Sequence, residues 1–240
     1  MLLAHTPWPE VEGYLARRTD ILIPIGATEQ HGPYGPIGTD WICAEGVARA
    51  AGERAGILVG PTLQVGMSLH HLRFPGSMAL KPSTMMAVLG DWAAALYGHG
   101  LRRLHLVNGH GGNIATVQAA FPEIYLRCPG LRCRISSWYA LPSVDALLQE
   151  RLGDAEGHHA TPGELSLAWH LHPEARRVTA PQSPPAPDTG IYDADDFRQR
   201  YPDGRVGADQ HRADPEFGRA LLEAAVVDLL AQHAVWLGES

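Results

Sequence analysis

The polar residues best suited to chemistry gather in one glycine- and proline-rich stretch, residues 21–40, which reads ILIPIGATEQHGPYGPIGTD. Glu29 and His31 are two residues apart, so an extended backbone directs both side chains to the same side. Asp40 follows the turn-forming GPIGT. Carboxylates and imidazoles bind divalent transition metals, so a metal site explains all three residues together. Asp40 could instead be the N-cap of the helix expected after it.

Two later stretches supply residues of the same kind. His110 lies in NGHGGN (108–113), and Glu164 follows a histidine-containing loop. Mixed nitrogen and oxygen ligands suit Zn²⁺, Mn²⁺ or Fe²⁺. A pair of ions is feasible, with Asp40 as the bridging carboxylate. Such a pair lowers the pKa of bound water and polarises a carbonyl oxygen, which are the requirements of amide hydrolysis.

The glycines of residues 108–113 also allow a different interpretation. A strand, a glycine-rich turn and a helix in succession superficially suggest a phosphate-binding loop. However, the stretch has neither the GxGxxG spacing nor a GK[ST] ending, which disfavours nucleotide binding. The glycines more plausibly let the backbone turn sharply and hold His110 at the tip of a strand.

The elements that must position these residues alternate between strands and helices. The run 21–25 is apolar and bounded by turn residues, which is typical of a parallel strand covered on both faces. Strand–helix–strand units imply a parallel sheet with right-handed crossovers and sites at the carboxyl ends of its strands. The pattern predicts strands over 21–25, 57–59, 101–107 and 131–136, and helices over 11–18, 41–54, 84–99, 114–126, the second half of 138–153, from 163 or 164 onward, and 217–236.

Two segments show little of the apolar periodicity that is typical of a helix. We expect residues 65–83 to form a wall of the site with a small hairpin around Phe74–Leu80, and Ser83 or Thr84 to cap the next helix. The proline-rich stretch 179–190 is typical of an extended surface linker. No repeat or convincing boundary divides the sequence, so we predict a single domain over residues 1–240.

Composition excludes several classes of protein. The net charge of −7 and the absence of a basic run disfavour nucleic-acid binding. The three cysteines have no metal-finger spacing, and their odd number disfavours a disulfide framework. The N-terminus has no signal-peptide pattern, and no apolar run approaches the roughly 20 residues of a membrane span. We therefore expect a soluble cytoplasmic protein without membrane association.

Several stretches together resemble the motifs of the creatininase (creatinine amidohydrolase) family. The first is GATEQHGPYGPIGTD (26–40), in which a glycine, a Glu-Gln-His-Gly and a later Asp recur. SLHHLRFPGS (68–77), NGHGGN (108–113) and HATPGELS (159–166) are similar to the second, third and fourth motifs. ADPEFGRALLEAAV (213–226) resembles the closing helix of the family. The resemblance covers nearly the whole chain, with the motifs in the same order.

The resemblance implies a single three-layer α/β/α domain with a mostly parallel central sheet and two divalent metal ions at the strand ends. By position, Glu29 would bind one ion, His31 would bind the other, and Asp40 would bridge them. His110 would complete one ligand set, and Glu164 would be a ligand or would orient metal-bound water.

The resemblance also suggests residues for proton transfer and substrate binding. His159 would protonate the departing nitrogen, as an imidazole can near neutral pH; a surface-loop histidine is the alternative. Ser68 and His71 would contact substrate, with a satisfied polar pair in the core as the alternative. We assign no role to His70, His99, His105 and His158.

The implied activity is hydrolysis of a C–N bond in a small amide, lactam or formamide by a metal-bound hydroxide. Creatinine itself is a doubtful substrate, because Gly111 and Gly112 stand where creatininases carry a Tyr and a Glu. The fourth motif also departs from the usual pattern at Thr161–Gly163 and Leu165. The alternatives are a peptidase-like member that trims a short peptide in cofactor biosynthesis, and a non-catalytic ligand-binding relative. The resemblance further suggests a homo-oligomer, with a hexamer as the suspected state.

Overall fold

A four-stranded parallel sheet forms the centre of the computed structural model, which describes residues 1–177 and 186–238. The strand order is β2-β1-β3-β4. Ile25 pairs with Asn108, and Asn108 pairs with Ser137, so β1, β3 and β4 end at the same edge of the sheet. The strands are β1 (Asp20–Ile25), β2 (Leu58–Val59), β3 (Arg103–Asn108) and β4 (Arg132–Ser137). The predicted parallel sheet is confirmed.

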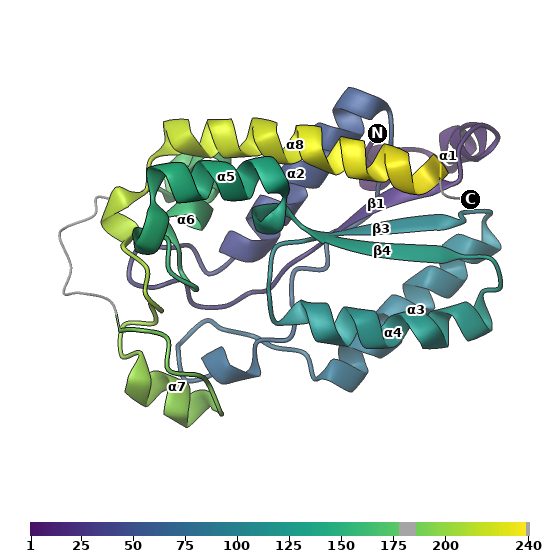
Figure 1. Cartoon of the computed structure of the whole chain (residues 1–240). Helices are drawn as coiled ribbons and strands as arrows, with labels where there is room; N and C mark the ends of the chain where they lie inside the picture. Colours follow the sequence, from purple (N-terminus) through teal and green to yellow (C-terminus); the bar gives the residue numbers. More distant parts are fainter. Residues whose placement is uncertain (178–185, 239–240) are drawn as a thin grey trace.

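Helices cover both faces of this sheet (Figure 1). One face packs against α2 (Thr39–Ala55), α5 (Pro142–Arg151), α6 (Pro162–Leu171) and α8 (Pro215–Gly238). The other face packs against α3 (Pro82–Gly98) and α4 (Asn113–Arg127), with a contribution from α1 (Trp8–Leu15). The remaining α-helix, α7 (Ala194–Arg200), lies beyond the end of the sheet. The three-layer α/β/α architecture is therefore confirmed.

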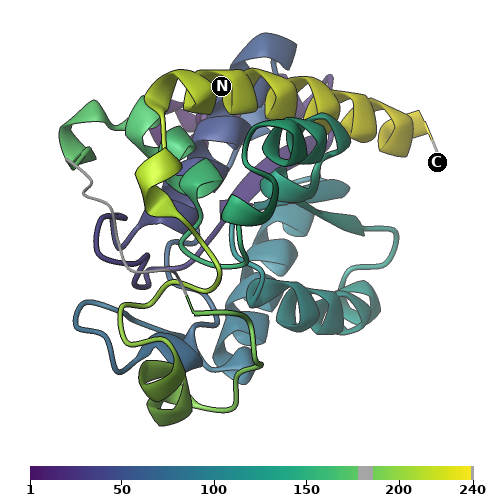
Figure 2. The same cartoon turned by 60° about the vertical axis from the view of Figure 1, so that its left-hand side comes forward.

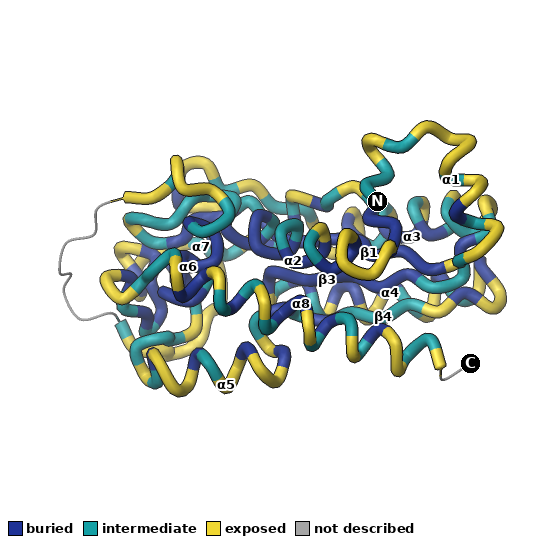
Figure 3. Tube along the Cα trace, turned by 90° about the horizontal axis from the view of Figure 1, so that it is seen from above, coloured by how far each residue is buried: buried dark blue, intermediate teal, exposed yellow. Residues whose placement is uncertain are grey.

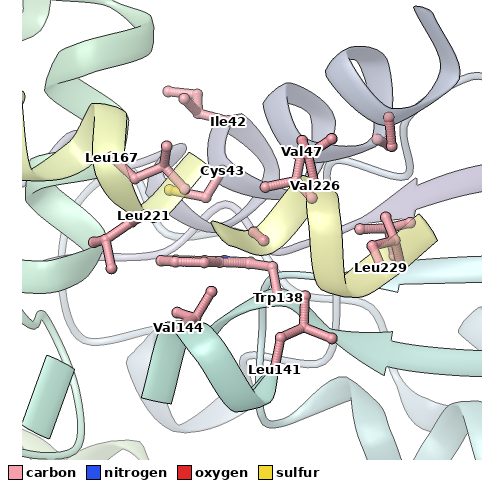
Figure 4. Close-up of a cluster of buried hydrophobic side chains, with 14 of the residues drawn as sticks. Ile42, Cys43, Val47, Trp138, Leu141, Val144, Leu167, Leu221, Val226 and Leu229 are labelled. Carbon is pink, nitrogen blue, oxygen red and sulfur yellow. The ribbon is translucent and has the colours of Figure 1, made fainter. Parts of the chain in front are cut away.

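The apolar residues of β1 contribute to two hydrophobic clusters, one on each face of the sheet. Every residue from Asp20 to Ile25 is buried, as the uninterrupted apolar pattern predicts (Figure 3). Leu22 joins the apolar cluster under α2 and α8, whereas Ile21 and Ile23 join the cluster under α3 and α4. Figure 4 shows the first cluster around Trp138. Removal of this apolar surface from water on both faces stabilises the sheet that carries the site.

The segment after β2 differs from the expectation. No hairpin forms around Phe74–Leu80. Instead, the Met78 amide donates to the Thr28 carbonyl at 2.8 Å, and a short 3₁₀ helix, η2 (Leu69–His71), precedes it. The Met78 bond ties the segment to the loop that follows β1, and most of the remaining backbone bonds within the segment close short turns, such as the Ser77 amide to the Phe74 carbonyl, rather than a hairpin ladder. Its predicted role as a wall of the site stays a prediction.

The predicted cap at Ser83 or Thr84 is wrong, and so is the alternative interpretation of Asp40 as a helix cap. Helix α3 begins at Pro82 after Lys81, so Ser83 and Thr84 lie inside its first turn. Proline is favoured at that first position because it lacks the amide hydrogen that would be unpaired there. The N-cap of α2 is Gly38, so Asp40 does not cap that helix. The carboxylate of Asp40 is thus available for another role.

Helix α8 is long and apolar enough to cross a membrane by length and composition alone, contrary to the expectation that no run reaches that length. It packs lengthwise over the sheet beside α5 (Figure 1). Its residues Leu221, Ala225 and Leu229 are buried, so one face of α8 packs into the core. The linker predicted over 179–190 falls largely outside the described residues, and the single-domain assignment stays a prediction.

Candidate metal centre

The five predicted ligands converge at the edge of the sheet where the strands end. Glu29 and His31 lie in the loop after β1, and Asp40 lies in the first turn of α2. His110 follows β3, and Glu164 lies in the first turn of α6. Carboxyl ends of parallel strands meet at one edge, which explains how residues so far apart in sequence come together.

Close packing of backbone brings Asp40 to His110. A Cβ atom at Gly109 would lie 2.1 Å from the carbonyl oxygen of Asp40, which no side chain could tolerate. Glycine at this position therefore allows the start of α2 to contact the end of β3. The backbone also turns at Gly111 and Gly112, directly after His110, but none of these three glycines has a positive φ.

The side chains form two groups of possible ligands that share Asp40. One group is Glu29, Asp40 and His110, and the other is His31, Asp40 and Glu164. One Asp40 oxygen, Oδ1, lies 3.1 Å from His31 Nε2. The other, Oδ2, lies 3.3 Å from His110 Nδ1. The Asp40 carboxylate therefore places one oxygen toward each group of possible ligands.

Several of these polar atoms are buried without a hydrogen-bond partner among the described residues. They are both carboxylate oxygens of Glu29, His31 Nε2 and Asp40 Oδ2. Buried polar groups in native proteins are almost always satisfied, so such a concentration calls for a missing partner. Nitrogen and oxygen donors of this kind suit Zn²⁺, Mn²⁺ or Fe²⁺. The residues present therefore fit a centre of divalent metal ions.

Burial and charge shift the pKa values of these groups strongly. Burial disfavours the imidazolium form of His31, but Asp40 and Glu164 outweigh it and raise the pKa of His31 to about 10. Burial likewise opposes protonation of His110, but Glu29 and Asp40 raise its pKa to about 9. Burial raises the pKa of Glu29 to about 7. Without metal, protons on the two histidines thus supply the positive charge that ions would otherwise supply.

Glu164 also stabilises the helix that carries it. Its Oε2 accepts a hydrogen bond from the Thr161 amide at 2.9 Å, and Thr161 Oγ1 accepts from the Glu164 amide at 3.1 Å. This reciprocal capping box begins α6 and fixes the glutamate rotamer. The same Oε2 lies 3.9 Å from His31 Nε2. The capping box therefore aims the carboxylate at the second group of possible ligands.

His159, the predicted proton-transfer residue, lies beside the first group. Its Nδ1 is 3.7 Å from Glu29 Oε1, and its Nε2 is 3.0 Å from the Gln30 carbonyl oxygen. The next residue, Ala160, has a φ of 59°, in the left-handed region that disfavours residues other than glycine. Gln210 donates to the Ala160 carbonyl at 3.0 Å and helps to hold this turn. The chain thus turns sharply between His159 and the start of α6.

Ser68 and His71, expected at the substrate, are both buried. His71 Nε2 lies 3.4 Å from Glu29 Oε1, and Ser68 Oγ lies 3.5 Å from His110 Nε2. Both side chains therefore contact possible ligands, which they can orient, and His71 also lines the cavity beside them. Substrate contact by these two residues stays a prediction.

Gln30 is a site residue that the sequence interpretation missed. Its side chain is buried and lies within hydrogen-bond distance of both His71 and His159. Its place between Glu29 and His31 in the Glu-Gln-His-Gly motif was the available signal. Its partners come from segments remote in sequence, so nothing local indicated what it contacts.

The match to a known protein family agrees with this geometry. Residues 4–232 match the family model Creatininase, described as creatinine amidohydrolase. The chain belongs to the creatininase family. The creatinine amidohydrolase of Pseudomonas putida is 28% identical over 94% of this chain and 93% of that protein. A mutant creatininase structure described as Zn-Zn type has a TM-score of 0.83 and 26% identity, and the match covers 96% of both chains.

A second kind of relative has a different name. The mycofactocin precursor peptide peptidase of Mycobacterium ulcerans is 34% identical over 165 residues, which are 64% of this chain. The match spans 59% of that peptidase. The chain thus has one relative named for a small molecule and another named for a peptide.

In this creatininase-family chain, a cavity of about 460 Å³ opens onto the candidate metal centre. Asp40, His110, His159 and Glu164 contribute to its wall. Farther wall residues come from α5, α7 and the loops beside them; they include Asp145, Gln149, Glu156, Ile191 and Phe197. Gly111 and Gly112 also line it, so no side chain from these two positions fills the space beside His110.

Proposed function

We propose that this chain is a metal-dependent hydrolase that cleaves a C–N bond in a small amide, lactam or formamide. The observation that carries the proposal is the position of Asp40 between two groups of possible ligands at the base of a cavity. Two divalent ions, as Zn²⁺, Mn²⁺ or Fe²⁺, would lower the pKa of a water molecule and polarise the substrate carbonyl.

The residues of the chain have separate roles in this proposal. Glu29, Asp40 and His110 would hold one ion, and His31, Asp40 and Glu164 the other. His159 Nδ1 faces this centre, where it can hold a proton and pass it to the departing nitrogen. Burial, followed by the nearby His31, lowers the pKa of His159 well below its ordinary value, which favours the neutral imidazole.

Cleavage of a short peptide is the second candidate. The mycobacterial relatives named as peptidases favour it. The cavity volume of about 460 Å³ lies within the range of ordinary small-molecule sites and leaves room for a peptide end. Both candidates break a C–N bond, so the metal ligands have the same role in each. The candidates differ in which part of the substrate the cavity wall away from the metal centre contacts.

The test combines metal analysis with substrate screening. Protein purified without chelator is expected to contain two ions per chain by elemental analysis, and Asp40→Ala is expected to lose most of both. Amides, lactams, formamides and short peptides are then screened. Loss of about 4 kcal/mol of transition-state stabilisation would lower kcat/KM about a thousand-fold in Asp40→Ala.

Asp145→Asn is the matched control, because Asp145 lines the cavity but belongs to neither group of possible ligands. It is expected to keep both ions. Less than one ion per chain in the parent protein, or equal metal content in the parent and Asp40→Ala, would contradict the proposal and favour a non-catalytic relative.

We further propose that the protein is cytoplasmic and forms a homo-oligomer, with a hexamer as the expected state. The net charge of −7 agrees with a partner that is a small molecule and not a nucleic acid. Light scattering coupled to size-exclusion chromatography would test the assembly, and a monomer under all conditions would contradict it.

A further inference from the structure

The carboxamide of Gln30 joins two histidines that come from different segments of the chain. Its Nε2 lies 3.0 Å from His71 Nδ1 and 2.8 Å from His159 Nε2. The same nitrogen lies 3.0 Å from the Gly204 carbonyl oxygen, and Oε1 accepts from the Gly32 amide at 2.8 Å. The Gly32 amide can only donate and the Gly204 carbonyl can only accept, so together they fix which end of the carboxamide is oxygen.

This orientation limits where the protons of the two histidines can be. Gln30 Nε2 has two hydrogens, and one of them goes to Gly204. His159 Nε2 also lies 3.0 Å from the Gln30 carbonyl oxygen, which must receive a hydrogen. If His159 carries its proton on Nε2, it donates to that oxygen, and the second Gln30 hydrogen goes to His71 Nδ1. In the opposite arrangement the second Gln30 hydrogen goes to His159 Nε2, so the Gln30 carbonyl oxygen and His71 Nδ1 both lose the hydrogen that the first arrangement supplies.

We propose that Gln30 is a positioning residue that fixes the proton of His71 on Nε2 and the proton of His159 on Nε2. The two rings then present opposite chemistry to Glu29. His71 directs an N–H toward Glu29 Oε1, 3.4 Å away. His159 directs the unprotonated Nδ1 toward the same oxygen, 3.7 Å away.

Because their protons lie on different sides relative to Glu29, the two histidines have different roles. A nitrogen that carries a proton cannot bind a metal ion, so His71 orients Glu29 by donating to it and is not itself a ligand. An unprotonated nitrogen can accept a proton or bind an ion, so His159 is the imidazole available to the centre. The catalytic value of this arrangement rests on the proposed function, but the proton positions do not.

Packing keeps both rings in place for these contacts. The rings of His71 and His159 are stacked, with centroids 4.4 Å apart and an angle of 26° between their planes. Phe197 of α7 covers both, with centroid distances of 4.5 Å to His71 and 6.2 Å to His159. In Figure 2, α7 (green) lies beside the blue segment that carries His71. Burial is the main cause that lowers the pKa of both histidines, which agrees with neutral rings.

The test is long-range ¹H–¹⁵N NMR of the histidine rings in metal-free protein at pH 7.5, where the two proton positions of a neutral ring give different spectra. The parent protein is expected to show the Nε2–H form for both His71 and His159. Gln30→Glu replaces the donor with an acceptor, so the proton of His71 is expected to move to Nδ1. Gln30→Met removes the donor, and His71 is expected to show a mixture of the two forms.

Gln210→Met is the matched control. Gln210 is also buried and donates to the carbonyls of His31 and Ala160, but it bonds to no imidazole. This variant is expected to leave both proton positions unchanged. The Nδ1–H form of His71 in the parent, or unchanged proton positions in Gln30→Glu, would overturn the proposal. The parent spectrum decides the first point even if a variant does not fold, and neither result depends on activity.

Discussion

The chain contains two buried clusters of histidines and carboxylates at opposite ends of its strands, and they are satisfied to very different degrees. At the metal-centre end, Glu29, His31 and Asp40 have buried polar atoms without a hydrogen-bond partner in the part of the chain that the structure describes. At the other end, Asp20 begins β1 and accepts from His233 Nε2 at 2.8 Å and from Arg18 at 2.6 Å. We call the second cluster, with His105 and Ser136, the Asp20 network.

In the Asp20 network, each buried side-chain nitrogen and oxygen has a hydrogen-bond partner among the described residues. His233 Nδ1 lies 3.0 Å from His105 Nδ1, and His105 Nε2 lies 2.9 Å from Ser136 Oγ. Ser136 in turn donates to Gln232 at 3.0 Å. A buried charged group that is fully paired needs no ligand, whereas one that is left unpaired is costly to bury. The comparison shows that incomplete bonding distinguishes the candidate site here, and that histidine content does not.

The largest predicted effect is a loss of folding stability when the Asp20 network is broken. Burial opposes ionisation of Asp20, but the hydrogen bonds from His233 and Arg18 hold its pKa well below the usual range. Removing one partner of a buried ion pair costs about 3–5 kcal/mol. Asp20→Asn is therefore expected to lower the free energy of unfolding by about that amount in urea, while metal content stays at the parent level.

The pH dependence of this effect follows from the depressed pKa. Asp20 contributes stability above the ordinary carboxyl pKa of about 3.9, and this contribution is lost as the pH falls through the folded-state pKa. The difference between parent and Asp20→Asn should therefore shrink in acid. Glu223→Gln, which breaks an exposed pair with Arg54, is the control and should change little. Loss of metal from Asp20→Asn at unchanged stability would show that the comparison is mistaken.

A smaller effect is expected from one methyl group beside His110. A Cβ at Gly112 would lie 2.4 Å from His110 Nε2 and 2.7 Å from the Met67 carbonyl oxygen. Gly112→Ala must displace the His110 ring. We therefore expect metal affinity to fall about 10–100-fold, as it does when residues that orient metal ligands are substituted. Competition with a chromogenic chelator would measure it.

Gly111→Ala provides the control at the neighbouring position. The atom nearest to its added Cβ is the Tyr139 hydroxyl oxygen at 3.5 Å, an ordinary contact. Parent-like affinity is expected. Equal affinities for the two alanine variants would mean that the orientation of His110 does not control metal binding.

The smallest predicted effect is a release of protons when metal binds. The raised pKa values of His31 and His110, about 10 and about 9, mean that both rings are charged at pH 7.5 without metal. Their contribution to stability is complete below about pH 6.5 and is lost as the pH rises through 9 to 10. Ions that replace these protons should expel up to about two per chain, and affinity should rise with pH toward 9.

Calorimetry in two buffers of different ionisation heat, at the same pH, would count these protons. The Asp20 network should contribute none, because its groups do not contact the centre. Metal binding without proton release would mean that the ions do not take the place of the histidine protons.

The sequence predicted the sheet well because the signals for its strands are local. Four apolar runs between turn residues match β1 to β4 within one or two residues at each end, and the order of strands and helices implied the parallel pairing. The hairpin at Phe74–Leu80 and the cap at Ser83 or Thr84 were wrong. The Met78 amide bonds to the remote Thr28 carbonyl, a contact that local propensity does not report. Helix α3 begins at Pro82, one residue before the expected cap.

The sequence also predicted which residues could be ligands, but it did not predict which polar groups each histidine and glutamine contacts. Glu29, His31, Asp40, His110 and Glu164 stood out because polar residues followed strands or began helices, and because they matched family motifs. His105 was assigned no role, and it lies in the paired network at the other end of β3. Gln30 was missed because a glutamine beside two candidate ligands has no distinctive chemistry until its partners are known.

The amino-acid sequence by itself determined the strands, the layers and the residue types that can bind metal, because periodicity, turn residues and family motifs are written along the chain. Only the tertiary structure decided which polar groups meet. Asp40 lies between the two groups of possible ligands because α2 packs against Gly109, and Gln30 lies between His71 and His159, which come from remote segments. Such contacts depend on distances between remote segments, and these distances exist only after the core has packed.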